Sequence, residues 1–344
     1  MDILLIFIII LSILSVCSII GGIIYTYFLI KNSHDDKNII NINNIFGTSI
    51  SIPNTTFLTF PHSFPDESMF VFTTPIITTS EQSNSLVTAY VWDTTKDSVS
   101  YSTSILSDDN DICMQFSGPI QFFLINNYSF LSSINPNIMK CGSNNGDGNL
   151  NGYKGKHTFQ DPFSDPSSVI IIIAGLNGSP FHDNSLASVQ CYDADYTGFS
   201  YIKTYGFPNE NDMTMEYHFA DTDYFNWIAI DKSYFDSTNN SHILQVGICD
   251  EAKSQGTCYF PNSFEIDSII VIATVNSFSP QKENDDYPAI VSVNISNINK
   301  DSFDYTKMYV SKEINHPKNM TTESFFWLAI DPTKLPEIKN IFIS

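Results

Sequence analysis

Two phrases that recur about every 100 residues constrain this chain of 344 residues more than any other feature. The first phrase, Phe-x-x-x-Phe, begins at Phe60, Phe159 and Phe260. The second, Trp-Ile/Leu-Ala-Ile-Asp, begins at Trp227 and Trp327, and a degenerate copy without Trp closes the first interval. Because a repeat of this length is the size of a domain, the sequence predicts three homologous units.

Each unit has the pattern of β-strands. Apolar runs at 69–77, 169–174 and 269–275 are rich in β-branched residues and too short for a buried helix. Turn residues and an alternating segment follow each run, as in hairpins. We therefore predict an all-β chain of three tandem antiparallel β-sandwiches, each with roughly six strands. The predicted boundaries are 44–132, 136–236 and 240–335.

The repeated aromatic residues are predicted to be structural. They recur in apolar, alternating segments, and a Trp beside an Ala in a last strand fills the centre of a sandwich. Direct stacking on a sugar is the alternative role for the two Trp residues. The predicted core residues are Trp227, Trp327, Phe60, Phe159 and Phe260.

The start of the chain is long enough and apolar enough to cross a membrane. Residues 3–30 carry no charge, and at about 1.5 Å per residue they span a hydrocarbon core of about 30 Å. Asp2 stands where a cleavable signal peptide, the alternative, would carry basic residues. We expect an uncleaved transmembrane helix over 1–30 and a polar stalk over 31–43. The β-domains are then expected to be extracytoplasmic, at a cell or virion surface.

Charge limits the partners. The chain has 16 Lys and Arg against 37 Asp and Glu, a formal net charge of −21. Phosphate backbones would be repelled, which excludes nucleic acid as a partner. Anionic lipid headgroups would be repelled as well, so the expected membrane contact is the anchor alone.

Two kinds of covalent modification are predicted. Cys249 closes the first strand of the third unit and Cys258 opens the next strand, so a hairpin brings them face to face. We expect a disulfide there, with two free buried thiols as the alternative. Sequons for N-glycosylation occur at Asn54, Asn127, Asn177, Asn239, Asn294 and Asn319.

The order of the repeated phrases resembles the H-type lectin domain of snail agglutinins and of discoidin C-terminal domains. The second unit carries the resemblance most completely, at Phe159, Phe163, Pro166–Ile170, Thr197–Phe199 and Asn226–Ile230. The resemblance implies a sandwich that binds sugars and associates as a trimer. Three copies in one chain could satisfy that association internally, as an intrachain pseudo-trimer.

The sugar contacts of that family are an Arg, an aromatic–His pair and acidic residues in the first long loop. This chain contains no Arg, and the Arg position falls near Ala187 and Ala289, so the inherited sugar specificity is not expected. The remaining positions give the candidate glycan-binding residues Asn145, Asp147, Asn149, Tyr205 and Phe207. A flexible linker is the alternative interpretation of the loop 144–149.

Sequence patterns of catalysis and metal binding are missing. The chain has no Cys-x-x-Cys, no His-Glu-x-x-His and no phosphate-binding glycine loop, so we expect no enzyme, metal or cofactor. Recognition or adhesion, by binding a glycan or a surface protein, is the predicted function. A structural coat protein that has lost sugar binding is the alternative. A hydrolase is the third class, but no paired carboxylates recur in the units.

The last residues begin the first-strand phrase once more. Asn340–Ile343 resembles the start of each unit, for example Asn44–Gly47. We therefore expect 336–344 to be an orphan strand that pairs with an exposed sheet edge.

Overall fold

A computed structural model gives the structure of the chain. It describes residues 41–42, 46–51, 56–60, 63–65, 69–79, 82, 84–107, 113–126, 134–144, 153–177, 185–209, 214–220, 224–236, 242–276 and 288–343. The chain divides into two compact units, 1–38 and 39–344, and every described residue belongs to the second. The predicted anchor over 1–30 lies outside the described residues. Among those that are described, no helix is long and apolar enough to cross a membrane.

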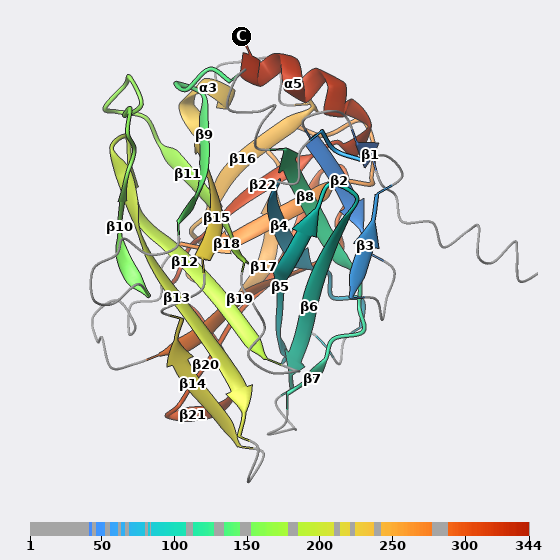
Figure 1. Ribbon diagram of the computed structural model, residues 1–344, viewed down its shortest axis with the longest axis vertical. Helices are drawn as coiled ribbons and strands as arrows, with labels where there is room; N and C mark the ends of the chain where they lie inside the picture. Colours follow the sequence, from blue (N-terminus) through green and yellow to red (C-terminus); the bar gives the residue numbers. More distant parts are fainter. Residues whose placement is uncertain are drawn as a thin grey trace, which may run out of the picture. The chain divides into compact units, whose positions relative to one another are not determined.

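The prediction of an all-β fold is confirmed, and within each repeat the strands form two antiparallel groups (Figure 1). The first repeat has the sheet β2 (Phe46–Ile50), β8 (Ile120–Asn126), β4 (Met69–Pro75) and the sheet β3 (Phe57–Thr59), β6 (Ser98–Leu106), β5 (Leu86–Thr95), β7 (Met114–Gln115). In the described residues each repeat therefore has seven named strands, where the sequence predicts roughly six. The additional strand pairs with the second strand of the central hairpin. It is β7 beside β6 in the first repeat, β14 beside β13 in the second and β21 beside β20 in the third.

The second and third repeats follow the same order of pairing. The second has β9 (Met139–Asn144), β15 (Tyr224–Asp231), β11 (Ile170–Asn177) and β10 (Lys154–Thr158), β13 (Gly198–Pro208), β12 (Leu186–Asp195), β14 (Met215–Phe219). The third has β16 (Leu244–Cys249), β22 (Phe325–Ile330), β18 (Ile270–Val275) and β17 (Gln255–Tyr259), β20 (Ser302–Ser311), β19 (Ala289–Ser296), β21 (Ile314–Asn319). One parallel pairing, Asn177 of β11 with Val91 of β5, joins a group of the first repeat and a group of the second into one seven-stranded sheet. Ahead of the first repeat, β1 (Asn41–Ile42) pairs with β2, so the end of the predicted stalk is a strand.

The Phe-x-x-x-Phe phrase closes each sandwich onto its hairpin turn. In the third repeat the Phe260 N–H donates to Asp301 O at 2.9 Å, and the Phe264 N–H donates to Lys300 O at 2.8 Å. The two rings pack edge to face with centroids 5.1 Å apart, a favourable arrangement of aromatic pairs. The same bonds are made by Phe60 to Asp97, Phe64 to Lys96, Phe159 to Thr197 and Phe163 to Tyr196.

A glycine in the first strand makes room for the repeated Trp. Trp227 and Trp327 are 5% and 2% exposed and lie opposite Gly142 and Gly247. A Cβ at Gly142 would lie 2.7 Å from Cζ2 of Trp227, and one at Gly247 would lie 2.4 Å from Cζ2 of Trp327. Leu124 holds the same register position in the first repeat. There Leu124 also faces a glycine, Gly47, so the glycine is present in all three repeats and packs against a Trp in the second and third.

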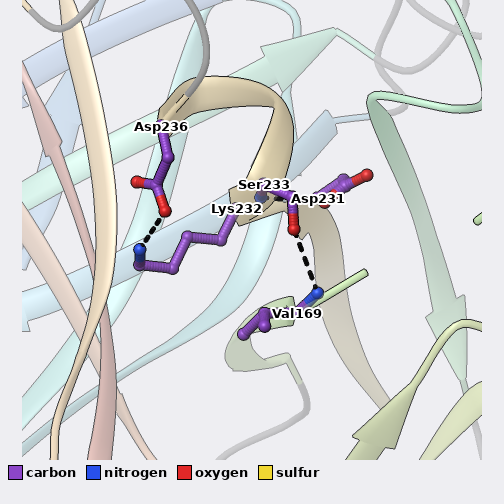
Figure 2. A network of polar contacts seen from close by, with 5 residues as sticks. All are labelled: Val169, Asp231, Lys232, Ser233 and Asp236. Carbon is purple, nitrogen blue, oxygen red and sulfur yellow. Dashed lines mark hydrogen bonds and ion pairs between the residues drawn. The ribbon is translucent and has the colours of Figure 1, made fainter. Parts of the chain in front are cut away.

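The Asp that ends the Trp phrase caps the turn after the last strand. In the second repeat Asp231 Oδ1 accepts the Ser233 N–H at 2.9 Å at the start of the short helix α3 (Lys232–Asp236). Figure 2 shows this turn, in which the Ser233 hydroxyl also accepts the Val169 N–H at 3.4 Å and the ends of α3 form an ion pair. Asp331 caps the corresponding 3-10 turn η3 (Pro332–Lys334) in the same way. A carboxylate suits this place because it satisfies otherwise unpaired N–H groups.

The prediction of an orphan strand over 336–344 is wrong, because Leu335–Ile343 forms the helix α5. The buried side chains of α5 are spaced three or four residues apart, the pattern of one helical face. They are Leu335, Ile338, Ile341 and Phe342. Pro336 lies in the first turn, where a helix tolerates Pro, whereas a central strand would lose a hydrogen bond there.

Helix α5 brings the end of the chain back to the first repeat. The Phe342 ring lies 5.8 Å from the Phe46 ring of β2 and 5.8 Å from the Phe235 ring of α3. The Asn135 N–H donates to Phe342 O at 2.7 Å. Figure 1 shows α5, in red, beside the blue strands β1 and β2. The helix therefore contacts both the first and the second repeat.

Equivalent hydroxyl groups join the three repeats in a ring. Thr88, Ser188 and Ser292 stand at corresponding places in β5, β12 and β19, and each bonds the backbone of the next repeat. The partners are the Ala187 N–H at 3.4 Å, the Val291 N–H at 3.2 Å and the carbonyl of Val87. The three hydroxyls line a cavity of about 70 Å³, to which each repeat contributes two strands.

Candidate binding site

Four side chains of the second repeat form what we call the aromatic surface: Tyr205 and Phe207 of β13, and Glu216 and His218 of β14. Tyr205 pairs with His218 and Phe207 pairs with Glu216, so all four lie on one face of the sheet. The three rings are nearly parallel, with interplanar angles of 8° to 21° and centroids 5.3 to 5.7 Å apart. The sheet thus presents a continuous stack of rings beside a carboxylate.

The strand period explains how the stack comes to be accessible. In β13 the side chains of Tyr201, Tyr205 and Phe207 share a face. Tyr201 is buried in the sandwich core, 4.9 Å from the Phe225 ring. Tyr205 and Phe207 continue that face and are half-buried. The opposite face is used for contact between repeats, since the Thr204 hydroxyl donates to Ala289 O of the third repeat at 2.8 Å.

The polar members of the aromatic surface are exposed and held in place. The side chains of His218 and Glu216 are 44% and 41% exposed, and His218 Nε2 lies 3.4 Å from Glu216 Oε2. The other carboxylate oxygen, Oε1, accepts a hydrogen bond from Asn209 Nδ2. An oriented carboxylate can accept hydrogen bonds from the hydroxyl groups of a ligand, while the rings offer an apolar face. That combination suits the two sides of a sugar ring.

The other two repeats have different chemistry at the same places. The Tyr205–His218 pair corresponds to Tyr309–Lys318 in the third repeat and to Ile105–Met114 in the first. Among the described residues, the second repeat alone stacks three rings at this pair of strands.

The sequence-predicted site residues are only partly brought together. Tyr205 and Phe207 are neighbours, whereas Asn145, Asp147 and Asn149 lie outside the described residues. Sequence reasoning missed Glu216 and His218, whose only signal was the alternation of polar and apolar residues along 215–219.

The two positions predicted to align with the Arg of H-type lectins have main-chain groups at contacts between repeats. Ala187 and Ala289 are both buried. The Ala187 N–H donates to Thr88 of the first repeat, and the Ala289 carbonyl accepts from Thr204 of the second. These contacts use main-chain atoms. The Ala187 side chain lies on the same face of the sheet as its register partner Tyr205, and so on the face of the aromatic surface.

Cys249 and Cys258 are adjacent, and in the structure both are free thiols that are buried. The hydrogen bond from Cys258 lowers the pKa of the Cys249 thiol to about 7, against the opposing effect of burial. The same interaction, together with burial, raises the pKa of the Cys258 thiol. The pair is thus placed for oxidation, and the disulfide stays a prediction.

Two of the predicted glycosylation sites have buried side chains in the structure, and all six stay predictions. Asn177 and Asn294 are 3% and 1% exposed, and Asn294 Nδ2 donates to Ser85 O of the first repeat. A glycan on either side chain would have to displace packed neighbours. Asn319 is exposed and suits modification, while the other three, Asn54, Asn127 and Asn239, lie outside the described residues.

Within the described part of the chain, no three His, Cys, Asp or Glu side chains are grouped so that they could hold a metal ion. Comparison with known proteins found no matching family model, no matching curated protein and no matching solved structure.

Proposed function

We propose that this chain is a non-catalytic recognition protein that binds glycans through the aromatic surface of its second repeat. The observation that carries the proposal is the stack of Tyr205, Phe207 and His218 beside the oriented carboxylate of Glu216. Partly exposed aromatic side chains with a few fixed polar groups are typical of binding sites and cost stability unless they are used. The three repeats are proposed to be H-type-lectin-like sandwiches, on the strength of the repeated phrases.

The proposed assembly is an intrachain pseudo-trimer carried on the membrane by the N-terminal segment. Support for the pseudo-trimer comes from the ring of hydroxyl contacts through Thr88, Ser188 and Ser292. Support for the anchor comes from the uncharged segment 3–30. In this arrangement the single aromatic surface faces the outside of the cell or virion.

The alternative function is structural, as a surface or coat protein whose repeats have lost sugar binding. Two observations favour it. The positions predicted to align with the Arg of H-type lectins are Ala187 and Ala289, and both are buried. The first repeat has Ile105 and Met114 where the second has an aromatic pair.

A glycan array tests the proposed function against the alternative. The full chain should retain a small set of glycans, and the Tyr205→Ala, Phe207→Ala double variant should lose them. The matched control is Tyr309→Ala in the third repeat, which should leave the array pattern unchanged. A chain that retains no glycan would favour the structural alternative. Equal retention by the double variant would move the site away from the aromatic surface.

A further inference from the structure

A second recess lies elsewhere in the second repeat. A cavity of about 350 Å³ is bounded by β9, by the end of β10 and by the loop after it. This volume falls within the range of about 300–1,000 Å³ that small-molecule sites occupy. Its buried floor consists of Met139, Cys141, Phe159 and Trp227. The half-buried Lys140 and the exposed Asp161 stand at its rim.

The third repeat shows why the second is open here. Gln245 holds the register position of Lys140, opposite Ala329 instead of Ala229. Gln245 Nε2 donates to Asn262 O at 2.6 Å, and Gln245 Oε1 accepts the Asn262 N–H at 3.1 Å. This pair of bonds ties the first strand to the loop after β17.

In the second repeat the corresponding side chain does not bridge the gap. Lys140 Nζ donates to Pro136 O on its own side and lies 4.5 Å from the centroid of the Phe163 ring. An ammonium group has three N–H donors, so two remain for a ligand. Desolvation lowers the pKa of Lys140, and the nearby Asp161 partly opposes that shift.

The indole N–H of Trp227 lacks an acceptor, as does that of Trp327 in the third repeat. Trp227 is 95% buried, and its Nε1 has no hydrogen-bond partner. Leaving a buried donor unpaired costs free energy, which a ligand with an acceptor atom recovers. The His157 ring, 4.6 Å from the indole, and the Phe159 ring, 5.7 Å from it, form an aromatic wall. The recess thus combines an apolar aromatic interior with donors that need an acceptor.

We propose that this cavity binds a small aromatic carboxylate. The ring of the ligand packs against Phe159 and Met139, and the carboxylate accepts hydrogen bonds from Lys140 Nζ. Asp161 at the rim repels a second negative charge, so the ligand is a monoanion. The site is distinct from the aromatic surface, because its residues lie on β9, β10 and β15 and those of the aromatic surface on β13 and β14.

The test uses fluorine NMR of the full chain with 4-fluorophenylacetate and its uncharged amide as probes. The fluorine resonance of the acid should broaden and shift when the wild-type chain is added. The amide should bind about tenfold more weakly, because its hydrogen bond to Lys140 lacks the charge. A wild-type chain that binds neither probe, or binds both equally, would overturn the proposal.

The third repeat supplies the decisive variant. The double variant Lys140→Gln, Asp161→Asn gives the second repeat the residues that the third has at these positions, Gln245 and Asn262. It should weaken binding of the acid by at least about tenfold. Gln245→Lys is the matched control and should leave acid binding unchanged. Lys140→Arg keeps the charge and should retain most of the affinity. Unfolding midpoints of all variants confirm that they fold, and undiminished binding by the folded double variant would overturn the assignment.

Tyr205→Ala separates this proposal from the proposed glycan function. It should abolish glycan retention and leave binding of the acid unchanged. Loss of both glycan retention and acid binding in this variant would contradict the proposal of two separate sites.

Discussion

The second and third repeats share a framework and differ at its rim. Both have the Trp opposite a Gly and the pair of edge-to-face Phe rings. In the third repeat, two hydrogen bonds between Gln245 and Asn262 tie the first strand to the loop after β17. The side chains of Cys249 and Cys258 lie in its interior. At the corresponding end the second repeat has Lys140 beside a cavity. The difference teaches that repeated residues build the sandwich, while the residues that vary between repeats decide what each one can bind.

Removing the repeated Trp should have the largest effect. Trp227→Ala and Trp327→Ala should each lower the free energy of unfolding by about 3–5 kcal/mol. The loss should be greater for Trp327, because a cavity already lies beside Trp227 in the second repeat. Denaturant unfolding of the full chain measures both. A larger loss of unfolding free energy for Trp227→Ala than for Trp327→Ala would contradict this difference between the second and third repeats.

Adding a methyl group to the glycine that faces each Trp should lower the free energy of unfolding by less than removal of the Trp. Gly142→Ala and Gly247→Ala should each destabilise the chain by about 1–3 kcal/mol, because the new Cβ overlaps the indole. Gly247→Ala should be the worse of the two, since its Cβ would lie 2.4 Å from the Trp ring, against 2.7 Å for Gly142. Urea unfolding gives the difference. Neutral effects at both positions would disprove the Gly–Trp packing.

The thiol pair of the third repeat should make its stability depend on pH. The pKa of Cys249 falls from 9.0 to about 7 in the folded chain, so its stabilising contribution is present at about pH 9 and is lost as the pH falls through 7. The free energy of unfolding under reducing conditions should therefore rise between pH 7 and 9. Cys249→Ser should remove the rise. Cys141→Ser of the second repeat, where burial raises the thiol pKa, is the control and should keep it.

The sequon at Asn319 in the third repeat should carry a glycan and the one at Asn177 in the second should not. Removing the glycan should have little effect on stability. If the β-domains enter the secretory lumen, Asn319→Gln should reduce the mass released by glycosidase treatment. Asn177→Gln should leave that mass unchanged, because Asn177 is buried. Mass spectrometry of the chain before and after treatment measures both, and a glycan on Asn177 would contradict the packing of β11.

The framework was predictable from sequence because its signals are local and repeated. Phe60, Phe159 and Phe260 recur with their turns, and the alternation of β13 places Tyr205 on one face. Helix α5 was missed because Asn340–Ile343 imitates a first strand, although Pro336 argued for a helix start.

The candidate sites depend on pairings that no short stretch of sequence reveals. His218 joins the aromatic surface only through the register of β14 with β13. The cavity exists because Lys140 does not make the bridge that Gln245 makes to a loop 17 residues away. Each of these is a contact between segments apart in sequence, whose geometry is set by the folded sheet.

The most direct test of the contrast between repeats counts the glycan sites on one chain. Isothermal titration of the full chain with a glycan retained on the array gives the stoichiometry. One site per chain is expected, lost in the Tyr205→Ala, Phe207→Ala variant and kept in Tyr309→Ala. Three equivalent sites, or one site that survives the double variant, would contradict the proposal that the second repeat alone binds glycans.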